Sequence, residues 1–359
     1  MHTHATRPGV TLPLVLAALA LPAAAEIVSI TGFTQAEVTE YRFDAPGDTD
    51  RASESFPGTA AELPLQVVAR LLSAIADEEA AAAAAAQFAD PRELAQPNPE
   101  EFAINLALNS ISPHIRYQAR AVSQETRGVV FAPAELGPFV QTGDTIDLTG
   151  RLFLDGALAI FAIDPDRDLS DAAVLLRVTV VQSSHSGAEQ TVFSGELELR
   201  GGTGGSATAV AAGGFPRRSV ILTDLSSLVD DFAAFHVLII PNITIDYDYT
   251  AVAGQEFSLR ATVEVEAANV AGECGVAAVI GTPVDTLRSV VELTQGTEAA
   301  AKMISALETE RAEPTGQPAF PEAQPAFGLL SGCGLLGFES LVGATVLAGM
   351  RRRRVGIQS

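Results

Sequence analysis

Residues 256–267 read EFSLRATVEVEA, where Phe257, Leu259, Val263 and Val265 alternate with polar or charged residues. A repeat of two residues places alternate side chains on opposite faces, which is typical of a β-strand with one buried face. The same repeat starts after Glu101 and recurs along the chain. It predicts strands over 102–108, 115–121, 145–154, 174–181, 190–199, 219–222, 236–249 and 256–267.

Turn-forming residues separate these predicted strands. They include Gly137-Pro138, Gly143-Asp144, the glycine-rich run 201–205 and Gly213-Gly214. Parallel βαβ units would need helices between the strands, and no helical pattern lies there. The sequence therefore predicts a mainly β fold, an antiparallel β-sandwich of about eight or more strands. Two further short strands are expected at 27–33 and 38–43.

Two stretches of the body predict helices instead. From Pro64, apolar residues recur at three- and four-residue spacing as far as Ile75, and an alanine run, Ala80 to Ala86, follows. Alanine has the highest intrinsic helix propensity, so we expect one helix over about 64–86, ended by Asp90-Pro91. A second helix is expected over 283–310, packed against the sheets.

Composition limits the classes of function. The 359 residues carry a formal net charge of −22, and the acidic excess is larger in the body because Arg7 and Arg351 to Arg354 lie at the ends. Such a surface repels phosphate backbones, which excludes nucleic acid as an expected partner. With only two cysteines, the chain cannot be a disulfide-stapled scaffold, so a hydrophobic core must hold the fold.

The N-terminal 25 residues have the order of a secretory signal peptide. Arg7 provides a positive start, residues 10–22 (VTLPLVLAALALP) are apolar, and Ala23 and Ala25 are small residues at the positions that a signal peptidase requires. The pattern predicts export by the secretion machinery and cleavage before Glu26. The alternative is a buried N-terminal helix.

The C-terminal region predicts a membrane anchor. Residues 313–326 are proline-rich and are expected to form an extended, solvated stalk. Residues 327–350 are apolar except for Glu339, and as a helix they would reach about 36 Å, enough to cross a hydrocarbon core of ~30 Å. Because Arg351, Arg352, Arg353 and Arg354 follow at once, the positive-inside rule places them in the cytoplasm and the body outside.

This combination of short motif, apolar helix and terminal arginines resembles the tripartite C-terminal sorting signals of bacterial surface proteins, which include the PEP-CTERM and MYXO-CTERM types. The motif here is Ser331-Gly332-Cys333-Gly334, and no Pro-Glu-Pro precedes the apolar segment. The resemblance implies processing by a sorting protease or transpeptidase, with Cys333 as the candidate anchor point. The alternative is an ordinary spanning helix with a structural cysteine.

These segments divide the chain into five parts. A signal peptide (1–25) precedes N-terminal strands with the alanine-rich helix (26–100). The β-sandwich body with its C-terminal helix (101–312), the stalk (313–326) and the sorting or anchor segment (327–359) follow. The expected location is the cell envelope or cell surface, with at least transient membrane anchoring.

One loop has the residue types of a calcium site. Asp164, Asp166, Asp168 and Asp171 lie at spacings that can bring several carboxylates together, as calcium requires. However, Pro165 stiffens the loop, Leu169 stands where a turn glycine would be, and Leu175 replaces the closing glutamate. A solvated acidic loop is therefore the preferred interpretation, and no cofactor is expected; calcium is the alternative.

Tyr247 and Tyr249 lie two residues apart and so share one face of a predicted strand, with Asp246 and Asp248 between and beside them. Aromatic rings flanked by carboxylates can stack on sugars, but the chain has no tryptophan and only four tyrosines. Cross-strand packing is the preferred role, and a glycan platform is the alternative.

The sequence carries neither a Gly-x-Ser-x-Gly elbow nor a His-Glu-x-x-His helix, so no enzyme activity is expected. We expect an exported, envelope-anchored surface protein of structural or binding type, whose ligand the sequence does not identify. The alternatives are a calcium- or glycan-dependent adhesion module, and an envelope hydrolase whose catalytic residues come from distant segments.

Overall fold

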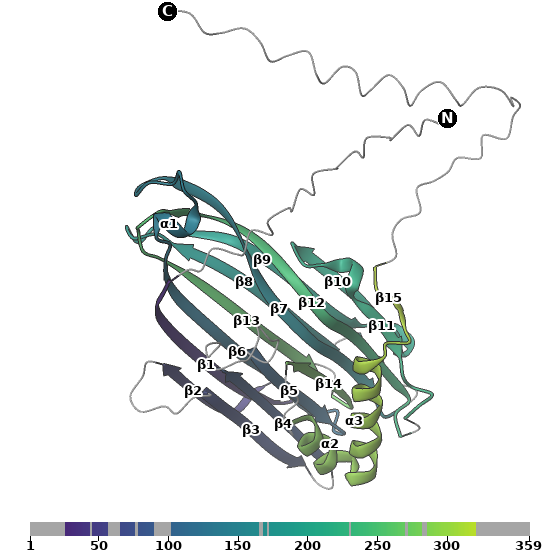
Figure 1. Ribbon diagram of the computed structural model, residues 1–359. Coiled ribbons are helices and arrows are strands. Elements are labelled where there is room, and N and C mark those ends of the chain that lie inside the picture. Colours follow the sequence, from purple (N-terminus) through teal and green to yellow (C-terminus); the bar gives the residue numbers. More distant parts are fainter. Residues whose placement is uncertain are drawn as a thin grey trace, which may run out of the picture. The chain divides into compact units, whose positions relative to one another are not determined.

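The computed structural model describes residues 26–43, 45–56, 65–75, 78–89, 102–164, 168–170, 172–229, 231–269, 272–281 and 286–320. These residues form two antiparallel sheets that face each other, so the predicted sandwich is confirmed (Figure 1). The first sheet, sheet A, has seven strands in the spatial order β10 (Ala207–Gly213), β9 (Glu189–Gly201), β8 (Ala172–Ser183), β13 (Phe257–Asn269), β6 (Ile115–Val130), β1 (Glu26–Arg42) and β2 (Ala45–Phe56).

The second sheet, sheet B, has eight strands. Their spatial order is β15 (Gln317–Pro318), β11 (Ile221–Asp224), β12 (Ala234–Val252), β7 (Thr145–Ala162), β14 (Cys274–Ile280), β5 (Phe102–Ser110), β4 (Glu78–Phe88) and β3 (Leu65–Ile75). The described residues also form three α-helices and two short 3₁₀ turns. These are α1 (Pro133–Leu136), α2 (Thr286–Gln295), α3 (Thr297–Ala312), and the turns Thr203–Gly205 and Arg217–Ser219.

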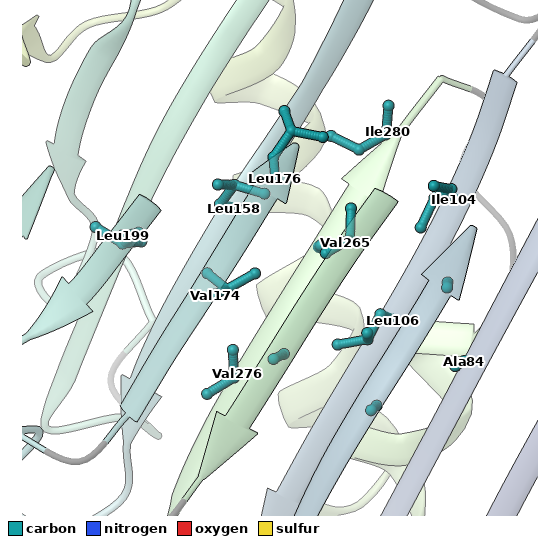
Figure 2. Close-up of a cluster of buried hydrophobic side chains, with 14 of the residues drawn as sticks. Ala84, Ile104, Leu106, Leu158, Val174, Leu176, Leu199, Val265, Val276 and Ile280 are labelled. Carbon is teal, nitrogen blue, oxygen red and sulfur yellow. The ribbon is translucent and has the colours of Figure 1, made fainter. Parts of the chain in front are cut away.

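The main core lies between the two sheets. Figure 2 shows side chains from both sheets meeting there, with Val174, Leu176 and Val265 from sheet A facing Ile104, Leu106 and Leu158 from sheet B. These six side chains have no exposed surface. The inward positions are those that the two-residue repeat predicts, because a strand presents every second side chain to the same face.

A second core lies on the outer face of sheet B, beneath α2 and α3 (Figure 1). Leu287, Val291 and Met303 of the helices pack there on Phe161 of β7 and Phe235 of β12. Strands β5 and β14 are therefore buried on both faces, and every residue of each is buried. This explains why CGVAAVI (274–280) has no alternation and was not predicted as a strand.

The predicted helix over 64–86 is wrong, because residues 65–75 and 78–88 form the paired strands β3 and β4. Ala80, Ala82, Ala84 and Ala86 face the main core, whereas Ala81 and Ala83 face the core under α2. Alanine is the side chain that lets a sheet and a helix both approach one strand closely. Burial on two faces outweighs the local helix propensity of alanine, which is worth less than ~1 kcal/mol per residue.

Two other predicted elements differ in length. The strands expected at 27–33 and 38–43 are one continuous strand, β1, which pairs with β6 over its whole length. The single helix expected over 283–310 is two helices, α2 and α3. They are separated by Gly296, whose φ of +89° lies in the left-handed region that glycine tolerates.

The body also extends further than predicted. Residues 313–320 are not a solvated stalk, because β15 pairs with β11 and the Ala319 amide donates to the Val220 carbonyl at 2.9 Å. The compact unit ends at Phe320, whose half-buried ring packs on the main core. The remainder of the predicted stalk, 321–326, lies outside the described residues.

Glu310 holds this last segment in place. Its carboxylate is 3% exposed and accepts hydrogen bonds from the Thr223 hydroxyl (2.7 Å), the Thr315 amide (2.6 Å) and hydroxyl (3.0 Å), and the Gly316 amide (3.1 Å). Burial alone would raise the pKa of Glu310, but the hydrogen bonds from Thr223, Thr315 and Gly316 outweigh it, and the pKa is lowered. One carboxylate therefore connects α3, β11 and the segment that follows α3.

Tyr117 allows a test of the packing beside β4, the strand that contains Ala80 to Ala86. The side chain is fully buried, its hydroxyl donates to the Ala80 carbonyl at 3.1 Å, and burial raises its pKa to about 12. We expect Tyr117→Phe to lower the free energy of unfolding by about 1 kcal/mol, since one buried hydrogen bond is lost. Tyr41→Phe is the matched control, because the Tyr41 hydroxyl makes an exposed bond to Gln118. Chemical denaturation measures both; equal effects would contradict the assigned contact.

Candidate functional site

The aspartates predicted as a calcium site are only partly described. Asp164 and Asp168 are both exposed, and the Asp168 carboxylate accepts a hydrogen bond from the Ser170 amide at 2.9 Å. Asp166 and Asp171 lie outside the described residues. Within the described part of the chain, no three His, Cys, Asp or Glu side chains are grouped in a way that could hold a metal ion. Calcium binding here remains a prediction.

Tyr247 and Tyr249 share one face of β12, and this face is the inner one. The Tyr247 ring covers Gly150 on β7, where a Cβ atom would come within 2.4 Å of the ring. The Tyr249 ring lies 6.0 Å from that of Tyr247 and 5.8 Å from that of Phe257 on β13, and burial raises the Tyr249 pKa. Both rings are therefore engaged in packing between strands and sheets.

The predicted terminal sites fall largely outside the described residues. This holds for Ala23 and Ala25, for Gly332, Cys333 and Gly334, and for Arg351 to Arg354. Glu26, the first residue after the predicted cleavage point, is also the first residue of β1. None of the helices in the described ranges has the length and apolar character needed to span a membrane.

The histidines and the body cysteine occupy structural positions. The His236 ring contacts the Gly205 carbonyl through Nε2 at 2.6 Å, and the His114 ring stacks on Phe43 at a centroid distance of 4.7 Å. His185 lies in an exposed turn. Cys274 is buried at the start of β14 and forms no disulfide within the described residues. These environments give no nucleophile–base geometry to build a mechanism on.

One groove lies on the outer face of sheet A. It has a volume of about 410 Å³ and is bordered by three carboxylates, Glu37, Glu198 and Glu266, and one guanidinium, Arg120. The strand register brings these residues into one row, because Glu266 pairs with Arg120, and Arg120 pairs with Glu37. Small side chains, Ala173 and Ala268 among them, form the hollow beside this row.

The charges of this groove neutralise one another. Arg200 lies 2.6 Å from Glu198, Arg51 lies 3.4 Å from Glu37, and Arg177 lies 2.8 Å from Glu266. Arg120 forms a further pair with Glu264 at 2.6 Å, which raises the pKa of Arg120. A ligand would have to displace these pairs, so we interpret the row as a cross-strand charge ladder that stabilises the sheet.

A second groove lies beside the part of β12 that extends beyond β11. Strand β12 pairs with β7 along its whole length, but β11 pairs only with residues 236–239 of β12. Beyond the bulge between Ile240 and Ile243, no described strand covers this side of residues 243–252. A pocket, here called the slot, lies between this part of the β7–β12 pair in sheet B and strands β8 and β9 of sheet A.

The slot is lined by residues of both sheets and has a volume of about 470 Å³. Asp147, Leu148 and Thr149 come from β7, and Gln182 and Gln190 come from β8 and β9. The remaining lining residues are Asp248, Tyr249 and Thr250 of β12. Gln182 and Gln190 are opposite one another in the β8–β9 register, so both amides face the slot from sheet A.

Two carboxylates, those of Asp147 and Asp248, border the slot. Among the described residues, neither Asp147 nor Asp248 forms an ion pair, and Asp248 accepts a hydrogen bond from the Thr149 hydroxyl at 2.8 Å. The Gln182 side chain donates to the Thr250 carbonyl at 2.5 Å, so at least one backbone group of the β12 edge points into the slot. The slot therefore offers backbone groups, amides and carboxylates to a ligand.

Sequence analysis singled out Tyr249 but missed the residues around it. Asp147, Gln182, Gln190 and Asp248 lie on four strands of two sheets, and a single strand pattern does not show that they meet. A partial signal existed, because Gln182 is a polar residue at an inward position of an otherwise apolar alternation, Val174 to Val180.

Comparison with known proteins gives no identification. No family model matches the chain, and no curated protein matches it. Solved structures that it resembles include that of infectious bursal disease virus Gx strain, at 10% identity over 80% of this chain and 73% of that chain, with a TM-score of 0.08. Another is that of the T=1 particles derived from the same virus, at 10% identity over 81% and 72%, with a TM-score of 0.08. Similarity at this level supports no inference about fold or function.

Proposed function

We propose that this chain is a non-catalytic binding module of the bacterial cell envelope, exported by its leader, held at the membrane by its tail, and binding its ligand in the slot beside β12. The observation that carries the binding function is the slot itself, a space of about 470 Å³ bordered by Tyr249, Gln182 and Gln190. Among the described residues, no arginine pairs with the bordering Asp147 or Asp248, whereas arginines pair with the carboxylates of the outer groove.

Two features of the body support the envelope location. The predicted cleavage before Glu26 would release the chain where β1 begins. The compact unit ends at Phe320, and residues 321–359 belong to a separate unit. An anchor in those residues would therefore leave the sandwich intact. In such a protein the tail serves retention, and the body serves binding.

The location is tested by mass spectrometry of the mature protein isolated from its own host. We expect an N-terminus at Glu26 and a membrane-associated C-terminus, either processed near Cys333 or intact through Arg354. Limited proteolysis of intact cells then reports whether the body is outside. A soluble cytosolic product with both ends uncut would rule out the envelope location.

Binding in the slot is tested without knowing the ligand, by hydrogen exchange. In the purified full-length protein, the edge amides of Asp246 and Asp248 should exchange quickly. In isolated native envelopes, where the ligand is present, we expect peptides covering 243–250 to exchange at least tenfold more slowly. The exposed turn 184–187 is the internal control and should exchange at the same rate in both preparations. Equal rates at 243–250 would contradict binding in the slot.

A further inference from the structure

Three side chains line the slot from between the two sheets and keep hydrogen-bonding capacity to spare. Within the described part of the chain, the Tyr249 hydroxyl and the Gln190 side chain form no hydrogen bond. Gln182 uses one N–H, which donates to the Thr250 carbonyl. Neither the Tyr249 hydroxyl nor the Gln182 side-chain oxygen is sealed from solvent. Since polar groups between packed sheets nearly always have partners, water or a ligand in the slot must supply them.

Gln182 is the best-fixed of these groups. Its side chain is 9% exposed and occupies an inward position of β8, where the other inward residues from Val174 to Val180 are apolar. The bond to the Thr250 carbonyl holds the amide plane, so the remaining N–H and the oxygen keep a defined direction. Gln190 lies opposite Gln182 in the β8–β9 register and adds a second amide. Two amides held side by side on a rigid sheet form a preorganised set of donors and acceptors.

The residues between the sheets determine the charge of a ligand. Tyr249, Gln182 and Gln190 are uncharged at neutral pH, and burial raises the pKa of Tyr249. No described residue that lines the slot is an arginine or lysine, so a phosphate or carboxylate would find no cationic partner. Asp147 and Asp248 project from the opposite, outer face of sheet B, so a cation between the sheets would have no counter-charge there. These environments favour a neutral ligand.

We infer that the slot binds a neutral sugar in its ring form, free or as a residue of a glycan. Its hydroxyl groups would exchange hydrogen bonds with Gln182 and Gln190, because hydroxyls and amides both donate and accept, and the C–H face of its ring would pack on Tyr249. The volume of about 470 Å³ lies within the range of small-molecule sites. This inference names the ligand class for the slot and depends on the proposed function. It differs from the tyrosine platform considered from the sequence, because Tyr247 is not among the described lining residues.

The test uses saturation-transfer NMR titrations with the purified full-length protein in a detergent that has no sugar headgroup. The probes are the methyl glycosides of the common neutral hexoses, 6-deoxyhexoses and N-acetylhexosamines, with glucosamine and glucuronic acid as charged probes. We expect saturable binding of at least one neutral glycoside and binding about tenfold weaker, or none, for both charged sugars. Tighter binding of the glycoside than of the corresponding free sugar would assign the ligand to a glycan, and the reverse order to a free sugar.

Two substitutions place the sugar in the slot. Tyr249→Phe and Gln190→Ala each remove a group without a hydrogen bond in the described part of the chain, so both variants should fold normally and bind the sugar about tenfold more weakly. The matched controls are Tyr41→Phe, whose hydroxyl bonds to the exposed Gln118, and Gln66→Ala on β3.

Two outcomes would overturn the inference. These are the absence of saturable binding to every neutral glycoside, and equal affinity in the slot variants and the controls. Protection of 243–250 in envelopes together with failure of all sugars would reject the ligand class while retaining the slot. If the protection is absent as well, the proposed binding function itself fails.

Discussion

Replacing Phe161 by alanine will lower the free energy of unfolding by about 3–5 kcal/mol, the range for removing a large buried aromatic side chain. The ring has no exposed surface and lies edge-on to Phe232 at 5.2 Å and to Phe235 at 6.3 Å. It joins β7 to the layer beneath α2 and α3. Chemical denaturation of wild type and variant measures the loss. Phe139→Ala is the control, because that ring is 92% exposed and its removal should change stability by less than ~0.5 kcal/mol.

A second substitution makes this prediction specific. Gly275 pairs directly with Phe161, and a Cβ atom at Gly275 would come within 2.0 Å of the ring. Gly275→Ala alone should therefore destabilise the fold by roughly 1–3 kcal/mol, as overpacking does. In the Phe161→Ala background the ring is gone, so the same methyl group should cost little or stabilise. A cost that is equal in both backgrounds would show that the ring does not occupy this space.

The second large effect is expected at Glu310. Glu310→Ala removes an acceptor for hydrogen bonds from Thr223, Thr315 and Gly316, and it takes this partner from the buried Thr223 hydroxyl. Since bonds to charged groups are the stronger ones, we expect a loss of about 3 kcal/mol in the free energy of unfolding. Hydrogen exchange should also accelerate in residues 313–320, which the carboxylate holds against β11. Glu308→Ala, on the exposed face of the same helix, should do neither.

The contribution of Glu310 should also depend on pH, in a known direction. Its folded-state pKa lies below the ordinary value of 4.5, so the folded state favours the charged form. The stabilisation is therefore complete above pH 4.5 and is lost as the pH falls through the folded-state pKa. In urea titrations between pH 7 and pH 3, the difference in stability between wild type and Glu310→Gln should shrink at the acidic end. If this difference stayed constant from pH 7 to pH 3, the pH dependence of stability would come from a group other than Glu310.

The candidate site shows where reading one strand at a time stops being informative. The alternation of β12 correctly placed Tyr247 and Tyr249 on one face, but it did not show that this face is the interior. The slot depends on facts about other elements: β7 pairs with β12, Gln190 lies opposite Gln182, and the Gln182 side chain reaches across from sheet A. None of these is a property of the residues that line β12.

The alternating stretches, of which 256–267 is the clearest, determined the β-sandwich class by themselves, because a strand with one buried face must repeat every two residues. The turn residues between those stretches likewise predicted the antiparallel order. Only the tertiary structure showed that Ala80 to Ala86 and 274–280 form strands, since residues buried on both faces carry no periodic signal. Their small side chains suit a strand between two packed layers as well as they suit a helix, and only the neighbouring layers settle the choice.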